Sequence, residues 1–409
     1  MKKDTLLVHG GRNPEDNFGI VNPPVYHAST VTFPTMEKYQ EKPAIPFDGV
    51  QYGRTGTPTT FALEEAVSDL YSGHKTVATS SGAAAIAIAM SAFLQSGDHA
   101  LIIDNVYGPT RTRVSDVLMA RSGIDISYFD PSQSIKHLIS PKTKIVYLEA
   151  PGSLTFEMID ISTVSAEAHA AGALVMMDNT WATALLFQPF EHGVDIIVEA
   201  GTKYIGGHAD IMLGLITVKT HEHHFAVKST ANAMGNCPGP DDCYLGLRGL
   251  RTLSVRMERH QKNAIQIAEW LQGRQEIDRV MYPALPDDPG YKIWKRDFNG
   301  ACGLFGVILK PFSENAIAAM LDNLTLFAMG ASWGGYESLI IPTEPSKIRT
   351  ATIWSTVNPC LRLHIGLEDP GDPEGDEGPT RAARSTKRRR KRNAVEVPTA
   401  VSRAEGPGW

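Results

Sequence analysis

Cysteine is scarce in this chain, with four residues among 409. So few cysteines do not make a disulfide-stabilised scaffold, and we expect free thiols in a reducing compartment. Cys237 and Cys243 lie close together in "GNCPGPDDC", but neither CxxC spacing nor a second ligand pair accompanies them. A structural zinc site is therefore not indicated.

Clustered metal ligands are also lacking. The histidines His221, His223 and His224 in "THEHHFA" stand in a polar segment without an accompanying pattern of inward-facing carboxylates. We interpret the segment as a solvated helix start or loop. We expect no metal site.

Long hydrophobic runs are absent as well. No apolar stretch reaches the ~18 residues that span a bilayer, and the amino end has only the short apolar run 6–8. We therefore expect neither a signal peptide nor a membrane partner, and we expect a cytoplasmic location. A hydrophobic fraction of 42% with 21% charged residues indicates a globular protein rather than a disordered one.

Changes in sequence texture divide the chain into four parts. Residues 1–58 are rich in turn-forming residues and predict an arm that contributes to a neighbouring subunit. Residues 59–240 alternate apolar runs with helix-like segments, and residues 241–370 combine a long amphipathic stretch with shorter strands. Residues 371–409 join an acidic run to a basic run, "TKRRRKRN", and we expect them to be disordered.

The runs "HALIIDN", "KIVYLEAP", "ALVMMDNT" and "VDIIVEAGT" are apolar on both faces, and helix-like segments separate some of them. This pattern predicts an α/β domain with a mostly parallel sheet that is covered on both sides. After residue 240, the stretch "YLGLRGLRTLSVRMERHQKNAIQIAEWLQG" predicts one long helix or two abutting ones. There "GLFGVILK", "LFAMGASWGG" and "CLRLHIG" predict strands of a smaller α+β domain.

Lys203, in "EAGTKYIGGHAD", follows one of the apolar runs, and Asp178 ends another. Both side chains therefore lie at the carboxyl ends of predicted strands, where open α/β sheets place their ligands. The pair is either a structural salt bridge or a pyridoxal phosphate site. In such a site the lysine binds the cofactor aldehyde and the aspartate keeps the pyridine nitrogen protonated.

A phosphate group needs hydrogen-bond donors of its own. "TSSGAAAIAIAM" follows a strand and opens a helix, so the backbone amides of Gly82 and Ala83 are candidates. Thr202 offers a hydroxyl beside the lysine. In the arm, Tyr52 and Arg54 would project to the same side of an extended strand, and Arg54 is either a phosphate ligand or a solvated surface residue.

Two further residues are candidates for contact with the ligand. Tyr107, in "DNVYGPTR", follows a predicted strand and either stacks on a flat ring or packs within its loop. Arg362, in "CLRLHIG", lies inside an apolar strand, where its charge requires a partner. A substrate carboxylate would be such a partner.

Seven motifs taken in order resemble one family: "YGRTGTPT", "SSGAAAI", "DNVYG", "MDNTWAT", "GTKYIGGHAD", "LRGLRTL" and "LRLHIGLED". The chain is similar to the Cys/Met-metabolism pyridoxal-phosphate enzymes over about residues 5–370. The resemblance implies the type I fold of pyridoxal-phosphate enzymes, like that of aspartate aminotransferase, with a large mostly parallel sheet domain and a smaller α+β domain. It also implies a homo-oligomer, a tetramer built from dimers, and pyridoxal 5'-phosphate as cofactor.

The resemblance assigns roles residue by residue. Lys203 would form the Schiff base and shuttle protons, Asp178 would pair with the pyridine nitrogen, and Tyr107 would stack on the ring and assist deprotonation. Phosphate contacts would come from Gly82, Ala83 and Thr202, and from Tyr52 and Arg54 of the neighbouring subunit. Substrate contacts would come from Ser332, Trp333 and Arg362.

Within the family, "EAPGSLTFEMID" and "SWGGYESLI" are similar to the bacterial cystathionine β-lyase branch. This branch implies αβ-elimination from L-cystathionine to homocysteine, pyruvate and ammonia, in methionine biosynthesis, and cystine or djenkolate fit the same chemistry. A γ-acting relative, either a lyase or a synthase, is the alternative enzyme. An alternative of another class is a non-catalytic protein that binds nucleic acid through residues 387–392, although the net charge of −6 argues against such a partner.

The sequence departs from its relatives at two places. Many relatives have serine three residues before the lysine, whereas this chain has Ala200, and the resemblance therefore implies one phosphate hydrogen bond fewer. Relatives continue after "HIGLED" into an amphipathic helix on the small domain. The segment 371–409 has no such apolar face, which predicts a less stable small domain.

Overall fold

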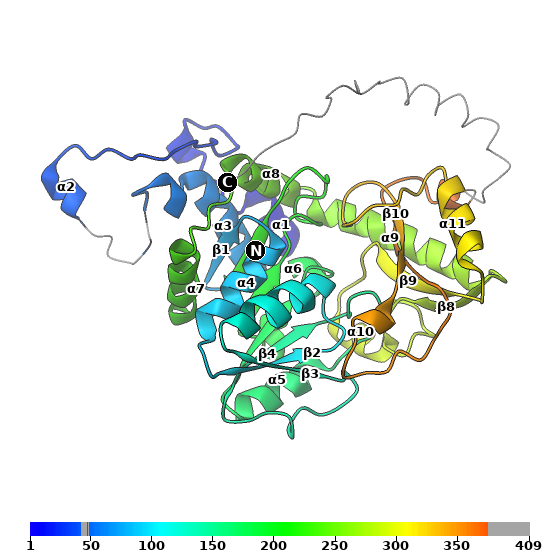
Figure 1. The fold of residues 1–409 in the computed structure, drawn as a ribbon. Coiled ribbons are helices and arrows are strands. Elements are labelled where there is room, and N and C mark those ends of the chain that lie inside the picture. The colour runs from blue at the N-terminus through cyan, green and yellow to red at the C-terminus, as the bar shows by residue number, and fades with distance from the viewer. Residues whose placement is uncertain (42–46, 48, 375–409) are drawn as a thin grey trace, which may run out of the picture.

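The computed structural model describes residues 1–41, 47 and 49–374. Its strands form two sheets that occupy separate regions of the molecule (Figure 1). The larger sheet has the strand order β1-β7-β6-β5-β4-β2-β3. Its strands are β1 (Lys75–Thr79), β2 (His99–Ile103), β3 (Asp125–Phe129), β4 (Thr143–Glu149), β5 (Leu174–Asp178), β6 (Ile196–Glu199) and β7 (Gly214–Val218).

The large sheet is mostly parallel, as the sequence predicts. The neighbours from β3 through β2, β4 and β5 to β6 run parallel, whereas β7 is antiparallel to both β1 and β6. Every residue of β2, β6 and β7 is buried, which means that both faces of the sheet are covered. The carboxyl ends of β4, β5 and β6 consequently meet at one edge.

Helices α3, α4 and α7 pack on β1 and β7, and α4 also reaches β6. Pro58 opens α3 at a position where a missing N–H costs nothing, and the Ser81 side chain caps α4 by accepting from the Ala84 amide at 3.1 Å. Apart from short 3-10 turns, the helices up to residue 250 are α1 (Lys3–His9), α2 (Met36–Gln40), α3 (Pro58–Tyr71), α4 (Gly82–Phe93), the π-helix η3 (Thr110–Met119), α5 (Ile161–Ala170), α6 (Thr183–Leu186), α7 (His221–Ala233) and α8 (Pro240–Leu250).

The smaller domain is built on an antiparallel sheet of order β10-β11-β9-β8. The long amphipathic stretch before it forms two abutting helices, because the chain turns between α8 and α9 at residues 251–252. The elements are α9 (Leu253–Gln272), β8 (Ile277–Met281), α10 (Tyr291–Asp297), β9 (Leu304–Leu309), α11 (Glu314–Asn323), β10 (Leu339–Thr343), β11 (Cys360–His364) and α12 (Gly371–Glu374).

The strand predicted from "LFAMGASWGG" is wrong. This segment is a loop that makes one isolated bridge, between Ala328 and Leu339, and the strand β10 follows it. Ser332 has φ of +80° and Gly334 has φ of +85°, and these left-handed conformations do not fit a strand. The loop is therefore able to turn toward the large domain.

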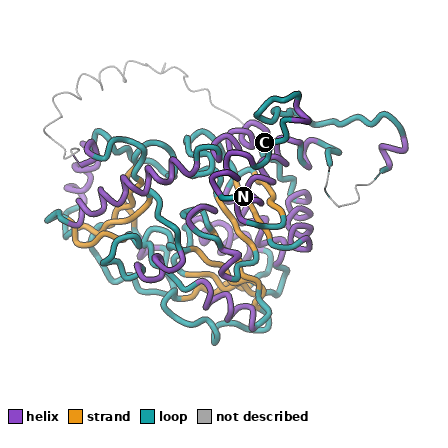
Figure 2. Tube along the Cα trace, turned by 180° about the vertical axis from the view of Figure 1, so that it is seen from behind, coloured by secondary structure: helices purple, strands orange, loops and turns teal. Residues whose placement is uncertain are grey.

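The arm begins differently from the prediction. Helix α1 packs on α3 and α9 of its own chain, with Leu7 buried and its carbonyl accepting a hydrogen bond from Arg251 at 2.6 Å. Beyond α1 the arm leaves the body of the molecule and carries α2 away from it (Figures 1 and 2). Phe18, Met36 and Tyr39 are exposed there.

Tyr52 has extended backbone and makes an isolated bridge with Thr30, but the extended conformation does not continue to Arg54, contrary to the prediction. Residues Gly53–Thr55 form a 3-10 turn, closed by the Thr55 amide donating to the Tyr52 carbonyl at 2.9 Å. The argument that an extended strand projects both side chains to the same side therefore does not hold here.

Helix α12 packs against α9 and occupies the first four residues of the segment that we expected to be disordered. The other residues of that segment, including the basic run 387–392, lie outside the described residues. Between α9, α11 and one face of the small sheet is an apolar groove of about 510 Å³. Its apolar lining includes Ile267, Trp270 and Leu271 of α9, and Leu309, Ile340, Leu361 and Leu363 of the sheet.

The four cysteines are free thiols, of which Cys237 is exposed and the other three are buried. His221 opens α7 behind the capping residue Thr220, while His224 turns into the interior. Within the described ranges, the structure holds no group of three or more His, Cys, Asp and Glu side chains arranged to bind a metal ion. Over the same ranges, no helix combines the length and apolar character that a membrane span requires.

Candidate active site

A cavity of about 360 Å³ lies at the carboxyl edge of β4, β5 and β6. Asp178 is the last residue of β5, and Lys203 lies in the turn that follows β6. Eight of the predicted site residues line this cavity: Gly82, Ala83, Tyr107, Asp178, Thr202, Lys203, Trp333 and Arg362. Its size suits a small-molecule ligand.

The Lys203 side chain reaches the cavity, and its pKa is lower than that of an ordinary lysine. Its Nζ donates a hydrogen bond to Ser332 Oγ and lies 5.2 Å from the ring centre of Trp333. Burial, and then the nearby Arg362 charge, lower the pKa of Lys203 to about 8, although Asp178 acts in the opposite direction. A lysine with this pKa can act as a nucleophile and as a base near neutral pH.

Asp178 is held in place by Thr180. Its Oδ1 accepts hydrogen bonds from the Thr180 amide at 2.9 Å and from the Thr180 hydroxyl at 2.5 Å. Burial raises the pKa of Asp178, while the bonds from Thr180 and the charge of Lys203 oppose that rise. A bound cation beside Asp178, such as a protonated ring nitrogen, would further favour its charged form.

The start of α4 offers an anion-binding site, which we call the anion seat, at one side of the cavity. The amides of Gly82 and Ala83 belong to the first turn, whose N–H groups have no acceptor within the helix. A Cβ on Gly82 would come within 2.7 Å of the Ala200 Cβ, so glycine permits the close approach of α4 to residue 200. A larger side chain than alanine at position 200 would have less room.

Thr202 makes its present hydrogen bonds to backbone. Its hydroxyl donates to the Leu213 carbonyl at 3.1 Å and accepts from the Leu213 amide at 2.9 Å. The predicted donation to a phosphate therefore requires the hydroxyl to reorient.

Tyr107 lies in the cavity wall after β2, and Glu149 fixes its backbone. The Glu149 carboxyl accepts from the Tyr107 amide at 2.6 Å. Burial, and then Asp178 and Glu149, raise the pKa of Tyr107, while Arg362 opposes the rise. The phenol is therefore neutral at physiological pH in this arrangement.

The loop 326–335 brings the small domain to the cavity. Arg362 donates to the Ser332 carbonyl at 2.8 Å, and burial lowers the pKa of Arg362 to about 10. A Cβ on Gly334 would stand 3.0 Å from the Cα of Lys203, so only glycine allows this contact. Ser332, Trp333 and Arg362 thus surround the amine from the small domain.

Tyr52 and Arg54 are not brought to this cavity within the chain. Arg54 donates to the Asn232 carbonyl at 2.9 Å, and Tyr52 is exposed. Their predicted contact with the phosphate of a neighbouring subunit therefore stays a prediction.

Several lining residues were missed by the sequence reasoning: Ser81, Glu149, Thr180, Trp181, Met212, and residues 151–154 and 156 of one loop. Glu149 could have been found, because it ends an apolar run as Asp178 does. Ser81 has the signature of a helix-capping residue. The loop 151–156 carries no such local signal.

The side chains present fit pyridoxal phosphate. The start of α4 offers amides to a phosphate, Asp178 offers a carboxylate to a ring nitrogen, and Lys203 offers an amine to an aldehyde. Tyr107 provides an aromatic face. The combination of an amine with a lowered pKa and a half-buried carboxylate is the chemistry that this cofactor needs.

Curated relatives resemble the chain over most of its length. The putative cystathionine beta-lyase of Rhizobium johnstonii is 46% identical over 382 residues, which cover 91% of this chain and 94% of the relative. Cystathionine beta-lyase MetC of Escherichia coli is 39% identical, with 91% and 96% covered. The L-alanine/L-glutamate racemase of Wolbachia pipientis is 37% identical, with 91% and 95% covered.

Solved structures share the fold. Cystathionine gamma synthase from Xanthomonas oryzae superimposes with a TM-score of 0.84 at 30% identity, and metB from Corynebacterium glutamicum with 0.83 at 32%. Each alignment covers 92% of this chain and 96% of the other. A sequence profile described as Cys/Met metabolism PLP-dependent enzyme matches residues 4–376. The chain therefore belongs to the family of Cys/Met metabolism PLP-dependent enzymes.

Proposed function

We propose that this chain is a carbon–sulfur lyase that cleaves L-cystathionine by αβ-elimination to homocysteine, pyruvate and ammonia, in methionine biosynthesis. The observation that carries the proposal is Lys203, an amine with a pKa of about 8 in the cavity that Asp178 and Arg362 also line. Relatives named cystathionine beta-lyase, at 36–46% identity, support the choice of substrate.

Bound pyridoxal phosphate supplies an aldehyde that captures the substrate amine and a ring that withdraws electrons from the substrate Cα. Arg362 binds the α-carboxylate through its guanidinium, and the Ser332 carbonyl orients that guanidinium. Lys203 Nζ takes the proton from Cα, after which homocysteine thiolate leaves from Cβ. The Asp178 carboxylate would favour the protonated form of the pyridine nitrogen.

Product analysis tests the proposal against a γ-acting enzyme. Cleavage at Cβ of cystathionine releases homocysteine and pyruvate, whereas γ-cleavage releases cysteine. The solved cystathionine gamma synthase of Xanthomonas oryzae is less identical to this chain than the β-lyase relatives named above, which favours the β reaction. We expect homocysteine and pyruvate in equal amounts, and cysteine as the main thiol product would overturn the proposal. Because one relative is a racemase, D-alanine formation from L-alanine is measured alongside.

We further propose that the active form is a homo-oligomer in the cytoplasm, a tetramer built from dimers in which Tyr52 and Arg54 of one subunit bind the cofactor phosphate of its neighbour. The exposed apolar side chains of the arm support this arrangement, and so does the observation that Arg54 does not line the cavity of its own chain. Arginine is suited to bidentate contact with phosphate.

Mixing an Arg54→Ala chain with a Lys203→Ala chain tests this arrangement. Each variant alone lacks one part of every site, but a hybrid dimer contains one site with both wild-type parts. Random assembly is expected to restore up to about a quarter of wild-type activity. Hybrids verified by two affinity tags that remain inactive would mean that each site is built from one chain.

The apolar groove on the small domain predicts that a carboxyl-terminal segment able to cover it would increase thermal stability. A version in which an amphipathic helix follows Asp369 in place of the present segment is expected to cover the groove and raise Tm by about 5 °C or more. The KM for cystathionine is expected to fall with it, because Arg362 lies on β11 beneath the groove, and cofactor retention is expected to stay unchanged. Equal Tm and KM in the two versions would mean that the present segment is harmless.

A further inference from the structure

A segment of the small domain, Arg349–Thr352, reaches across to the large domain. It lies between β10 and β11, and it meets the buried Asp104 at the end of β2. The Asp104 carboxylate accepts from the Thr350 amide at 3.0 Å, from the Thr352 amide at 2.8 Å and from the Thr352 hydroxyl. One buried carboxylate of the large domain thus accepts hydrogen bonds from two threonines of the small domain.

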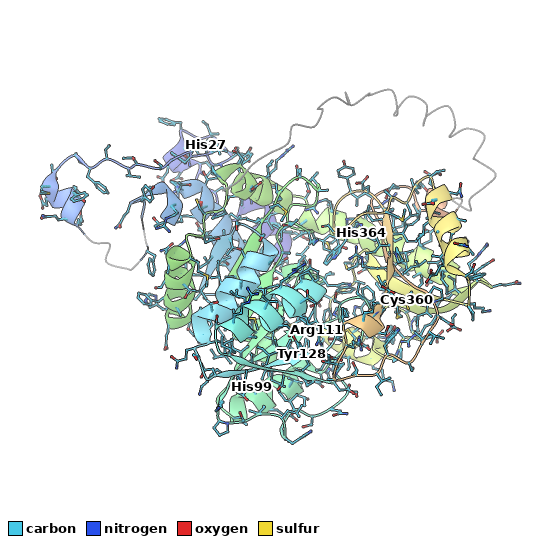
Figure 3. The ribbon with its side chains drawn as sticks, in the orientation of Figure 1. His27, His99, Arg111, Tyr128, Cys360 and His364 are labelled. Carbon is cyan, nitrogen blue, oxygen red and sulfur yellow. The ribbon has the colours of Figure 1, made fainter. Side chains whose placement is uncertain are left out.

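Arg111, on η3, completes this contact. Its guanidinium donates to Asp104 Oδ1 at 2.5 Å and to the Thr350 hydroxyl at 3.0 Å, and it lies 3.4 Å from the ring centre of Tyr128. Figure 3 labels Arg111 and Tyr128 next to each other. Burial acts to raise the pKa of Asp104, but the hydrogen bonds from Thr352 and the backbone outweigh it and hold the pKa below its usual value.

Arg349 makes a second connection, to the loop 152–157. Its guanidinium binds both Glu157 oxygens, at 2.9 and 2.5 Å, and also the Thr155 hydroxyl. Only 3% of the Arg349 side chain is exposed. Burial acts to raise the pKa of Glu157, but the hydrogen bond and charge of Arg349 hold it below its usual value.

The loop that Arg349 holds is strained. Leu154 has φ of +66° and Phe156 has φ of +57°, which are unfavourable conformations for bulky side chains. Such strain persists only where the surroundings impose it. Arg349 is placed to contribute to that constraint, because it binds Thr155, between the two strained positions, and Glu157, just after them.

The two segments of the large domain that these contacts hold, the one after β2 and the loop 152–157, form walls of the active-site cavity. Tyr107 follows Asp104 by three residues, and residues 151–154 and 156 line the cavity directly. Asn105 links the two walls. Its side-chain amide donates to Glu157 Oε2 at 3.1 Å, and its backbone carbonyl accepts from the Ser153 amide at 2.8 Å. We name the six residues Asp104, Arg111, Glu157, Arg349, Thr350 and Thr352 the domain clamp.

We propose that Arg349 is a positioning residue for the reaction, which acts through the domain clamp by holding the loop 152–157 in the strained shape that fits the substrate. The part of this inference that concerns substrate rests on the proposed function, whereas the part that concerns the loop does not. Loss of Arg349 leaves the loop free to relax, so the cavity wall no longer matches the substrate.

Hydrogen exchange of the holoenzyme tests the loop without any substrate. The Gly152 amide donates to the Glu157 carbonyl at 2.9 Å, and the Phe156 amide donates to the Gly152 carbonyl at 2.9 Å. In Arg349→Met these amides are expected to exchange at least about tenfold faster than in the wild type. Arg349→Lys keeps the charge without the bidentate fork and is expected to give an intermediate rate.

Arg296→Met is the matched control. Arg296 is also an arginine of the small domain that binds a carboxylate just beyond the loop, Asp160, at 3.0 Å, but it does not contact residues 152–157. We expect wild-type exchange in the loop and wild-type kinetics in this variant. A general loosening of the domain interface would instead affect both variants.

Steady-state kinetics give the second readout. KM for cystathionine is expected to rise about tenfold in Arg349→Met, with kcat changed less than about threefold, as for a lost binding contact. Unchanged loop exchange in a folded Arg349→Met or Arg349→Lys protein would overturn the proposal, and so would faster exchange with an unchanged KM. A wild type that does not cleave cystathionine would refute the proposed function alone, because the exchange experiment still decides the role of Arg349.

Discussion

Lys203→Ala is expected to lower kcat/KM for L-cystathionine at least about a thousandfold, because a single amine serves as the attachment point of the cofactor and as the base at Cα. The fold is expected to survive, since the contacts of the amine with the described residues are one hydrogen bond to Ser332 and the approach to the Trp333 ring. Tm and the anion seat at α4 therefore stay near their wild-type state.

The control for Lys203 is Lys142→Ala, which removes an exposed lysine at the opposite end of the sheet from the cavity. Pyruvate release followed under saturating cofactor compares the two variants. A Lys203→Ala enzyme that keeps a tenth or more of wild-type activity would show that another group performs both tasks.

Asp178→Asn has the second largest expected effect, a loss of kcat of about a hundredfold to a thousandfold. The substitution keeps the shape of the side chain and an acceptor for the two bonds from Thr180, but it removes the charge that favours a protonated ring. The visible absorption band of the cofactor is expected to shift, which a merely structural defect would not cause.

Asp195→Asn is the matched control for that charge. Asp195 also accepts a backbone hydrogen bond, from Val175 at 2.8 Å, and it pairs with His169 outside the cavity. We expect wild-type activity and an unchanged absorption band. Similar losses in both variants would mean that the effect of Asp178 is on folding and not on the ring.

The sequence predicts the half of the site that strand topology builds. Asp178 and Lys203 follow apolar runs, and the carboxyl ends of neighbouring parallel strands must meet, so their convergence follows from local patterns. Gly82 was found in the same way, from a strand that leads into a helix. These residues depend on contacts within one domain.

The other half of the site depends on contacts between the small domain and the large domain. Ser332 and Trp333 reach Lys203 only because a loop with two left-handed residues turns away from the small sheet, and that loop was predicted as a strand. Arg349 and Glu157 are separated by 192 residues, and no periodicity relates them. Resemblance to a family assigned roles to Ser332 and Trp333, but no sequence pattern pointed to Arg349.

Covalent trapping of the cofactor tests the central claim most directly. Borohydride reduces the carbon–nitrogen double bond between pyridoxal phosphate and its lysine, and peptide mapping of the reduced holoenzyme then locates the label. We expect a yellow protein that loses its colour on reduction and carries the label on Lys203, in the peptide that contains "GTKYIGGHAD". A label on any other lysine, or no label in a protein saturated with cofactor, would contradict the assignment of this cavity as the active site.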